Sequence, residues 1–156
     1  MLLIGSNAPM DKELLDSIKD VKEWGGNAFQ IFIGNPQTAT MTSKTKINSK
    51  EFDDIRDFCK TYKMQGVIHS SYKINLSNPI NQNQSALNNL IFDMNACGIM
   101  NLNGVIVHMG SQINTSSYQE AFHNFIDSII WILDKTEKAP LDINKKVWIK
   151  FPFCRS

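Results

Sequence analysis

The chain has 156 residues, of which 42% are hydrophobic and 20% are charged, and its formal net charge is +1. This length suits a single domain, expected over residues 1–156, and the composition is that of a globular protein rather than a disordered one. The sequence has neither an apolar run of about 18 residues nor a leader pattern at Met1, which predicts an intracellular protein, cytoplasmic or nuclear and not secreted, without a membrane span.

Short apolar runs alternate with stretches of helical periodicity along the chain. Glycine, asparagine and proline separate them, as at Gly25-Gly26 and Gly34-Asn35-Pro36. Cys59 and Cys97 fall on predicted helices, where reduced core thiols are expected. The predicted strands are residues 2–6, 28–36, 66–70, 104–111 and 146–153, and the predicted helices cover 11–25, 51–62, 87–98 and 118–133.

Two residue pairs predict where helices begin. Asn48 and Glu51 form a plausible capping box for the second helix, and Ser116 with Gln119 can cap the fourth. His123 lies in the middle of the fourth helix, and we interpret it as a surface or packing residue rather than a ligand. The fourth helix also carries a long apolar stripe made of Tyr118, Phe122, Phe125, Ile129 and Leu133.

Four strand–helix repeats followed by a fifth strand indicate an α/β fold with a parallel sheet and right-handed crossovers. The strands are nearly continuously apolar, which predicts that both faces of the sheet are covered. Two architectures fit this pattern: an open doubly wound sheet, and a partial (β/α)8 TIM barrel of about five strands. In either one, functional residues lie beyond the carboxyl ends of the strands.

His69 and His108 both occupy that position. Each ends an apolar strand and is followed by a turn of small residues. One such histidine can do no more than hydrogen-bond to a backbone carbonyl, but two of them on neighbouring strands favour a shared site. Neutral imidazole is the commonest metal ligand in proteins, and zinc suits mixed histidine and carboxylate sites. The motifs of dinucleotide binding, of the P-loop and of the nucleophile elbow do not occur in the sequence.

The stretch VIHSSYKINLSNP closely resembles the signature of the endonuclease IV family of apurinic/apyrimidinic endonucleases. GVIVHMGS, FIGNPQ, LLIGS and LDKT are similar to other segments of that family, in its order and at its spacing. The resemblance implies a zinc-dependent (β/α)8 barrel that cuts DNA 5′ to an abasic sugar, with His69 and His108 as zinc ligands. The family's DNA-contacting loops fall on Asn35, Gln37, Tyr72 and Lys73.

Two positions depart from the family's metal ligands. Asn7 stands where the first strand usually carries a histidine, and Lys150 stands where the fifth strand ends in a bridging glutamate. A lysine ammonium has no acceptor, and its charge would repel metal ions. We therefore expect the chain to be equivalent to the N-terminal half of such a barrel, to look truncated and to be inactive alone.

Three further hypotheses follow from these departures. The open edges of a partial barrel favour self-association. A non-catalytic remnant that binds DNA or a partner chain is one alternative function. A fragment of a sugar isomerase-like barrel, which shares the architecture, is another.

Overall fold

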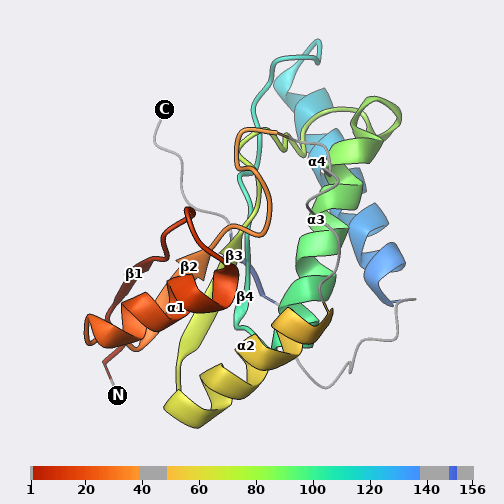
Figure 1. Cartoon of the computed structure of the whole chain (residues 1–156). Helices are drawn as coiled ribbons and strands as arrows, with labels where there is room; N and C mark the ends of the chain where they lie inside the picture. The colour runs from red at the N-terminus through yellow and green to blue at the C-terminus, as the bar shows by residue number, and fades with distance from the viewer. Residues whose placement is uncertain (1, 39–48, 138–147, 151–156) are drawn as a thin grey trace.

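The structure, a computed structural model, describes residues 2–38, 49–137 and 148–150. Strands and helices alternate throughout this part of the chain (Figure 1). The α/β pattern of four strand–helix repeats and a fifth strand, predicted from the sequence, is thereby confirmed. The elements are β1 Gly5–Asn7, α1 Leu14–Glu23, β2 Ala28–Ile31, α2 Ser49–Tyr62, β3 Gln65–His69, α3 Ile80–Met100, β4 Gly104–Ile106, α4 Tyr118–Glu137 and β5 Trp148–Lys150.

The five strands form one parallel sheet in the order β1-β2-β3-β4-β5. Ala28 of β2 is in register with Gly5 of β1 on one side and with Gln65 of β3 on the other. His69 at the end of β3 is in register with Ile106 of β4. An open doubly wound sheet reverses its strand order at a switch point, whereas a barrel keeps the strands in sequence order. The observed order is that of a barrel segment.

Burial alternates along β2 and β3. Phe29, Ile31 and Ile68 are buried, whereas Gln30, between the first two, and Gln65, at the start of β3, are only partly buried. The expectation that both faces of the strands would be covered was therefore wrong for the described residues. With every strand next to its sequence neighbour, right-handed crossovers bring the helices to one face of the sheet, and the other face presents the two glutamines.

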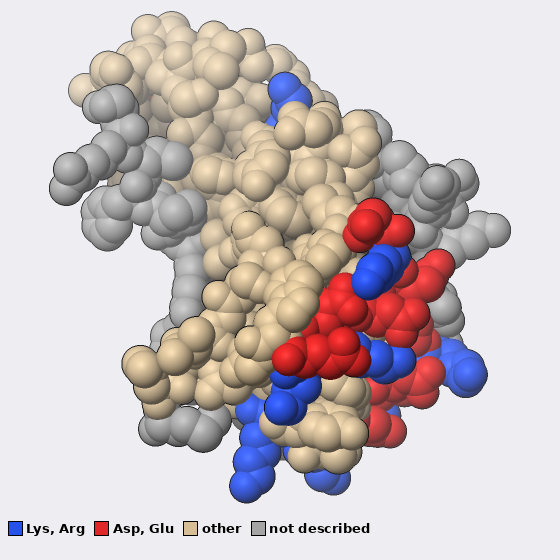
Figure 2. All heavy atoms as spheres, turned by 60° about the vertical axis from the view of Figure 1, so that its left-hand side comes forward, with Lys and Arg blue, Asp and Glu red and all other residues tan. Residues whose placement is uncertain are grey.

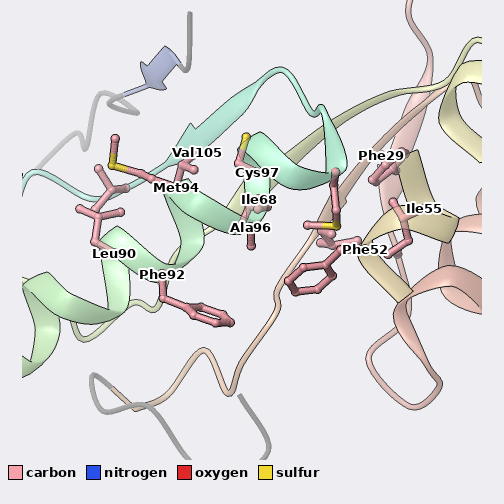
Figure 3. Packing of buried hydrophobic residues seen from close by; sticks show 14 of the residues in the cluster. Phe29, Phe52, Ile55, Ile68, Leu90, Phe92, Met94, Ala96, Cys97 and Val105 are labelled. Carbon is pink, nitrogen blue, oxygen red and sulfur yellow. The ribbon is translucent and has the colours of Figure 1, made fainter. Parts of the chain in front are cut away.

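The hydrophobic core lies between the sheet and the helices, as the close-up in Figure 3 shows. Phe52 of α2, Leu90 of α3 and Val105 of β4 are among its fully or almost fully buried side chains. Cys59 and Cys97 are free thiols buried in this core, as expected from their helical positions. Burial raises the pKa of Cys97 to about 12, which keeps the thiol protonated and unreactive.

Glu51, predicted to cap its own helix, takes part in a contact between two helices. Its Oε1 accepts a hydrogen bond from the backbone N–H of Leu14 at 3.0 Å. A carboxylate at a helix N-terminus accepts a hydrogen bond from a free N–H group and interacts favourably with the positive end of the helix dipole. Glu51 thus stabilises the first turn of α1, while its predicted partner Asn48 lies outside the described residues.

The N-terminus of α4 is capped one residue later than the sequence pattern predicted. The backbone N–H of Glu120 donates to Ser117 Oγ at 3.1 Å, and Glu120 Oε2 in turn accepts from the backbone N–H of Ser116 at 2.8 Å. Glu120 therefore has the role that was predicted for Gln119. Both pairs satisfy the same spacing rule, so the sequence alone does not choose between them.

Helix α4 carries more apolar surface than the described residues cover. Phe125 and Ile129 of the predicted stripe pack against the core, but its other three members are exposed. The buried face of α4 runs through Ala121 and Ile132, so the predicted apolar stripe is only partly buried. No described helix is both long and apolar enough to cross a membrane. We call the exposed residues Tyr118, Phe122, Ile126, Ile130 and Leu133 the α4 stripe.

Candidate metal and nucleic-acid site

Four aromatic rings meet beyond the carboxyl ends of β2, β3 and β4. The ring centroids of His69 and His108 are 5.2 Å apart, so the structure brings together the two histidines that were predicted to share a site. The ring of Tyr72 lies 5.1 Å from His69 and 5.6 Å from His108. Phe32 completes the cluster at 5.0 Å from His69. Sequence reasoning missed Phe32, although it directly follows the apolar strand β2.

A single hydrogen bond orients His69. Its Nδ1 lies 2.7 Å from the carbonyl oxygen of Ser70, and because a carbonyl can only accept, Nδ1 carries the proton. The lone pair of the neutral ring is then on Nε2. Burial lowers the pKa of His69, the hydrogen bond to Ser70 acts in the opposite direction, and the nearby His108 lowers it further. The net lowering favours neutral imidazole, which is the form that binds metal ions.

The histidine pair fits half of a zinc site. Structural and catalytic zinc ions take three or four protein ligands, and the pair supplies two nitrogens. The residues that the structure describes contain no group of three or more His, Cys, Asp or Glu side chains arranged to hold a metal ion. The amide oxygen of Asn7 accepts a hydrogen bond from Gln30 Nε2 at 2.8 Å. The described part of the chain therefore does not complete a metal cluster.

Two of the three loops around the rings are joined through one carbonyl. The backbone N–H of Tyr72 and the hydroxyl of Ser71 both donate to the oxygen of Pro36, at 2.9 and 3.0 Å. Asn35 Oδ1 accepts from the backbone N–H of Gln37 at 2.8 Å, which closes a tight turn. The loop with Asn35 and Gln37 is thus brought beside Tyr72, and the Gln37 side chain is exposed.

Asn75 fastens the third loop. Its Oδ1 accepts from the backbone N–H of Ser111 at 3.0 Å, and its Nδ2 donates to the Ser111 carbonyl at 2.9 Å. Gly110 has a φ of 100°, and a Cβ on it would lie 1.9 Å from Asn75 Oδ1, so only glycine fits there. Asn75 was missed as a site residue because its role depends on a contact between loops that are 36 positions apart.

The loops around the rings are polar but almost uncharged. Lys73 is the single Lys, Arg, Asp or Glu in residues 32–38, 70–79 and 109–117, and its side chain is exposed. The charged side chains visible in Figure 2 gather over one part of the surface. Ion pairs are found instead between Lys12, just before α1, and Asp20 of α1, and between Arg56 and Asp53 of α2. A polyanion at the rings would meet few cations from the described residues.

A buried carboxyl group lies behind the site. Asp93 of α3 is 4% exposed, and its Oδ2 accepts a hydrogen bond from Ser70 Oγ at 2.5 Å. Burial raises the pKa of Asp93 to about 7, while the bond from Ser70 acts in the opposite direction. Asp93 was missed by sequence reasoning, although an aspartate within the apolar run LIFDM is a visible signal.

Comparison with known proteins assigns this fold to a family. The family described as the xylose isomerase-like TIM barrel matches residues 18–144. The chain belongs to the xylose isomerase-like TIM barrel family. Together with the sequential strand order, this membership confirms the partial barrel predicted from the sequence.

Relatives within this family agree with the resemblance to endonuclease IV. A curated protein of Mycoplasma capricolum named probable endonuclease 4 is 27% identical over 136 residues, which cover 82% of this chain and 46% of the relative. The chain spans about half the length of the curated relatives it matches.

Solved structures show the same architecture. Endonuclease IV from Thermus thermophilus matches with a TM-score of 0.61 and 19% identity, over 84% of this chain and 45% of that one. An L-ribulose 3-epimerase matches with a TM-score of 0.66 and 7% identity, over 97% and 49%. At these identities the likeness shows the fold alone.

The buried Asp93 predicts a specific dependence of stability on pH. A folded-state pKa of about 7, above the ordinary value of 3.8, means that the folded chain retains a proton that the unfolded chain releases. The free energy of unfolding should therefore be highest below the unfolded pKa and fall as pH rises through this window. Asp93→Asn cannot titrate, so its stability relative to wild type should rise by on the order of 3–4 kcal/mol between about pH 4 and pH 7. Urea unfolding across this range measures the difference, and parallel profiles for the two proteins would contradict it.

Proposed function

We propose that this chain is the N-terminal part of an endonuclease IV-type enzyme, whose barrel cuts the DNA backbone at abasic sites. One observation carries the proposal: the rings of His69 and His108 lie 5.2 Å apart, beside Tyr72, at the carboxyl ends of neighbouring strands. The names of the curated relatives support the same assignment. Solved sugar epimerases share only the fold, so they do not support the sugar isomerase alternative to the same degree.

The residues of this chain would bind and position rather than complete the chemistry. His69 and His108 would hold one zinc ion through ring nitrogens, and zinc at such a site supplies Lewis acidity toward a phosphate oxygen and lowers the pKa of bound water. Tyr72 is 47% exposed and offers a ring face on which a base of an opened duplex can stack. Lys73 can neutralise one phosphate, and Asn35 and Gln37 would approach the backbone from the neighbouring loop.

Non-catalytic DNA binding is the second candidate function. It is favoured by the two-histidine ligand set of the described residues and by the lysine at position 150, whose backbone pairs with Ile106 of β4. A lysine cannot replace a bridging carboxylate between metal ions. The 156 residues would then bind DNA without cutting it.

Binding to DNA should be weak and only slightly dependent on salt. One phosphate contact from Lys73 gives a slope of about −0.9 in log K against log salt concentration, and Lys73→Gln should bring that slope close to zero. Tyr72→Ala should weaken binding by about 5-fold or more at every salt concentration, because stacking contributes about 1–3 kcal/mol per base. Fluorescence anisotropy with abasic and intact duplexes measures both effects.

Tyr118→Ala provides the matched control, since Tyr118 is an exposed tyrosine on α4. We expect less than about 10-fold preference for the abasic duplex. A preference of about 100-fold, equivalent to roughly 2.7 kcal/mol, would contradict a partial lesion site and show a competent pocket.

The purified chain should not incise an abasic duplex in the presence of zinc. Two imidazoles leave the coordination shell incomplete, and a lysine at position 150 cannot supply the bridging carboxylate that the resemblance to endonuclease IV implies there. Lys150→Glu alone should not restore activity, because it adds one ligand of the several that are needed. A labelled abasic duplex incubated with the zinc-loaded chain tests this, and incision that disappears in His69→Ala would make the chain an enzyme by itself.

We also propose that the chain associates with a second copy of itself. The α4 stripe extends the apolar surface of the helix beyond its core-facing side, and β1 and β5 are the edge strands of the described sheet. Exposed apolar surface and open strand edges are the two features that drive such association. Sedimentation velocity should show a mass that rises with concentration for wild type and a monomer for Phe122→Asp/Ile130→Asp. Asp127→Lys, on the exposed polar side of α4, is the control, and a wild type that stays monomeric would refute the proposal.

A further inference from the structure

We propose that Asp93 is a positioning residue for His69, acting through Ser70. The inference rests on the proposed function only where it assigns metal binding to His69. The link from Asp93 to the histidine ring runs through two hydrogen bonds. Its hydroxyl partner Ser70 is the residue whose carbonyl fixes the His69 ring.

Ser70 is held from two sides. Its backbone N–H donates to the oxygen of Ile106 at 2.9 Å, which continues the β3–β4 pairing one residue past His69. Its hydroxyl donates to Asp93 Oδ2 of α3, behind the sheet. With one anchor in the sheet and one in the helix layer, the Cα of Ser70 is held in place. This restricts how far its carbonyl can turn away from His69 Nδ1.

Both groups of this link are buried, so each would destabilise the fold if it lacked a hydrogen-bond partner. Ser70 is 1% exposed and Asp93 is 4% exposed. Asp93 lies between Phe92 and Met94, which are both buried in the core. A buried carboxyl group is tolerated only with hydrogen-bond partners, and an apolar residue of similar size at such a position commonly leaves stability unchanged or raises it. Core packing alone thus gives no reason for an aspartate at this position.

The link matters because it selects the nitrogen that is available to a ligand. With Nδ1–H bonded to Ser70, Nε2 holds the lone pair on a ring whose centroid is 5.2 Å from that of His108. In metal sites generally, the hydrogen bond on the second ring nitrogen sets both tautomer and orientation, and its loss costs about 10- to 100-fold in metal affinity. Asp93 contributes to this constraint indirectly, by holding Ser70.

Three variants separate positioning from folding. Asp93→Leu removes the acceptor but keeps the branched shape of the side chain, Ser70→Ala removes the donor, and Asp93→Asn keeps an oxygen that Ser70 can bond. Ser128→Ala is the control, because Ser128 Oγ on α4 is a buried hydroxyl without a hydrogen-bond partner in the described structure.

The first measurement is the tautomer of His69 in the metal-free chain, from the 15N shifts of the two ring nitrogens about two pH units above the ordinary histidine pKa. Wild type, Asp93→Asn and Ser128→Ala should show protonated Nδ1, and Asp93→Leu and Ser70→Ala should show a mixture of tautomers. Unchanged protonation of Nδ1 in the latter two, or its loss in Ser128→Ala, would overturn the inference. If Asp93→Leu fails to fold, the tautomer in Ser70→Ala tests the inference, because this variant removes only the hydroxyl that donates to Asp93.

The second measurement is the affinity for zinc alone, together with the free energy of unfolding. Asp93→Leu and Ser70→Ala should bind zinc about 10-fold or more weakly than wild type, with Asp93→Asn within about 3-fold. A merely structural role predicts instead that zinc affinity falls only where the free energy of unfolding falls. Full zinc affinity in Ser70→Ala would overturn the inference. A wild type that binds no zinc would refute the proposed function, while the tautomer measurement would still decide the role of Asp93.

Discussion

The rest of the structure depends on one constraint, the right-handed crossover between parallel strands that are neighbours in both sequence and space. Repeated along β1 to β5, it brings the helices to one face of the sheet and every strand's carboxyl end to the same edge. The register of β3 with β4 then sets His69 opposite Ile106, two residues before His108. The histidine pair is therefore a product of topology, and the loops need only supply the rings and hydrogen bonds around it.

Those loops give the site its chemical character. Asn75, Pro36 and Ser71 tie three loops together with hydrogen bonds from amides, hydroxyls and backbone groups, so the surface is ordered without charge. Ion pairs are concentrated on α1 and α2 instead. In the proposed complex with DNA, recognition by such a surface would rest on stacking and hydrogen bonding with an opened duplex. Electrostatic attraction to phosphates contributes little from the described loops.

Periodicity and strand-end position were sufficient to predict the elements and the meeting of His69 with His108, whereas the choice of a barrel segment over an open sheet came from the resemblance to endonuclease IV. These features depend on local patterns and on one topological rule, which the sequence displays directly. The roles of Phe32 and Asn75 could not be predicted, because each depends on a contact that exists only after distant loops are assembled. The buried face of α4 could not be predicted either. Its apolar residues span so wide an arc that the pattern does not show which of them face the sheet.

The central claim is that His69 and His108 share one ion, and a zinc titration of the metal-free chain by calorimetry tests it most directly. The account predicts a single weak site that is lost in both His69→Ala and His108→Ala. His123→Ala should retain it, since His123 is exposed on α4 and is not among the rings of the cluster formed by Phe32, His69, Tyr72 and His108. Zinc binding that survives both single substitutions, or two or three tightly held ions per chain, would contradict the account.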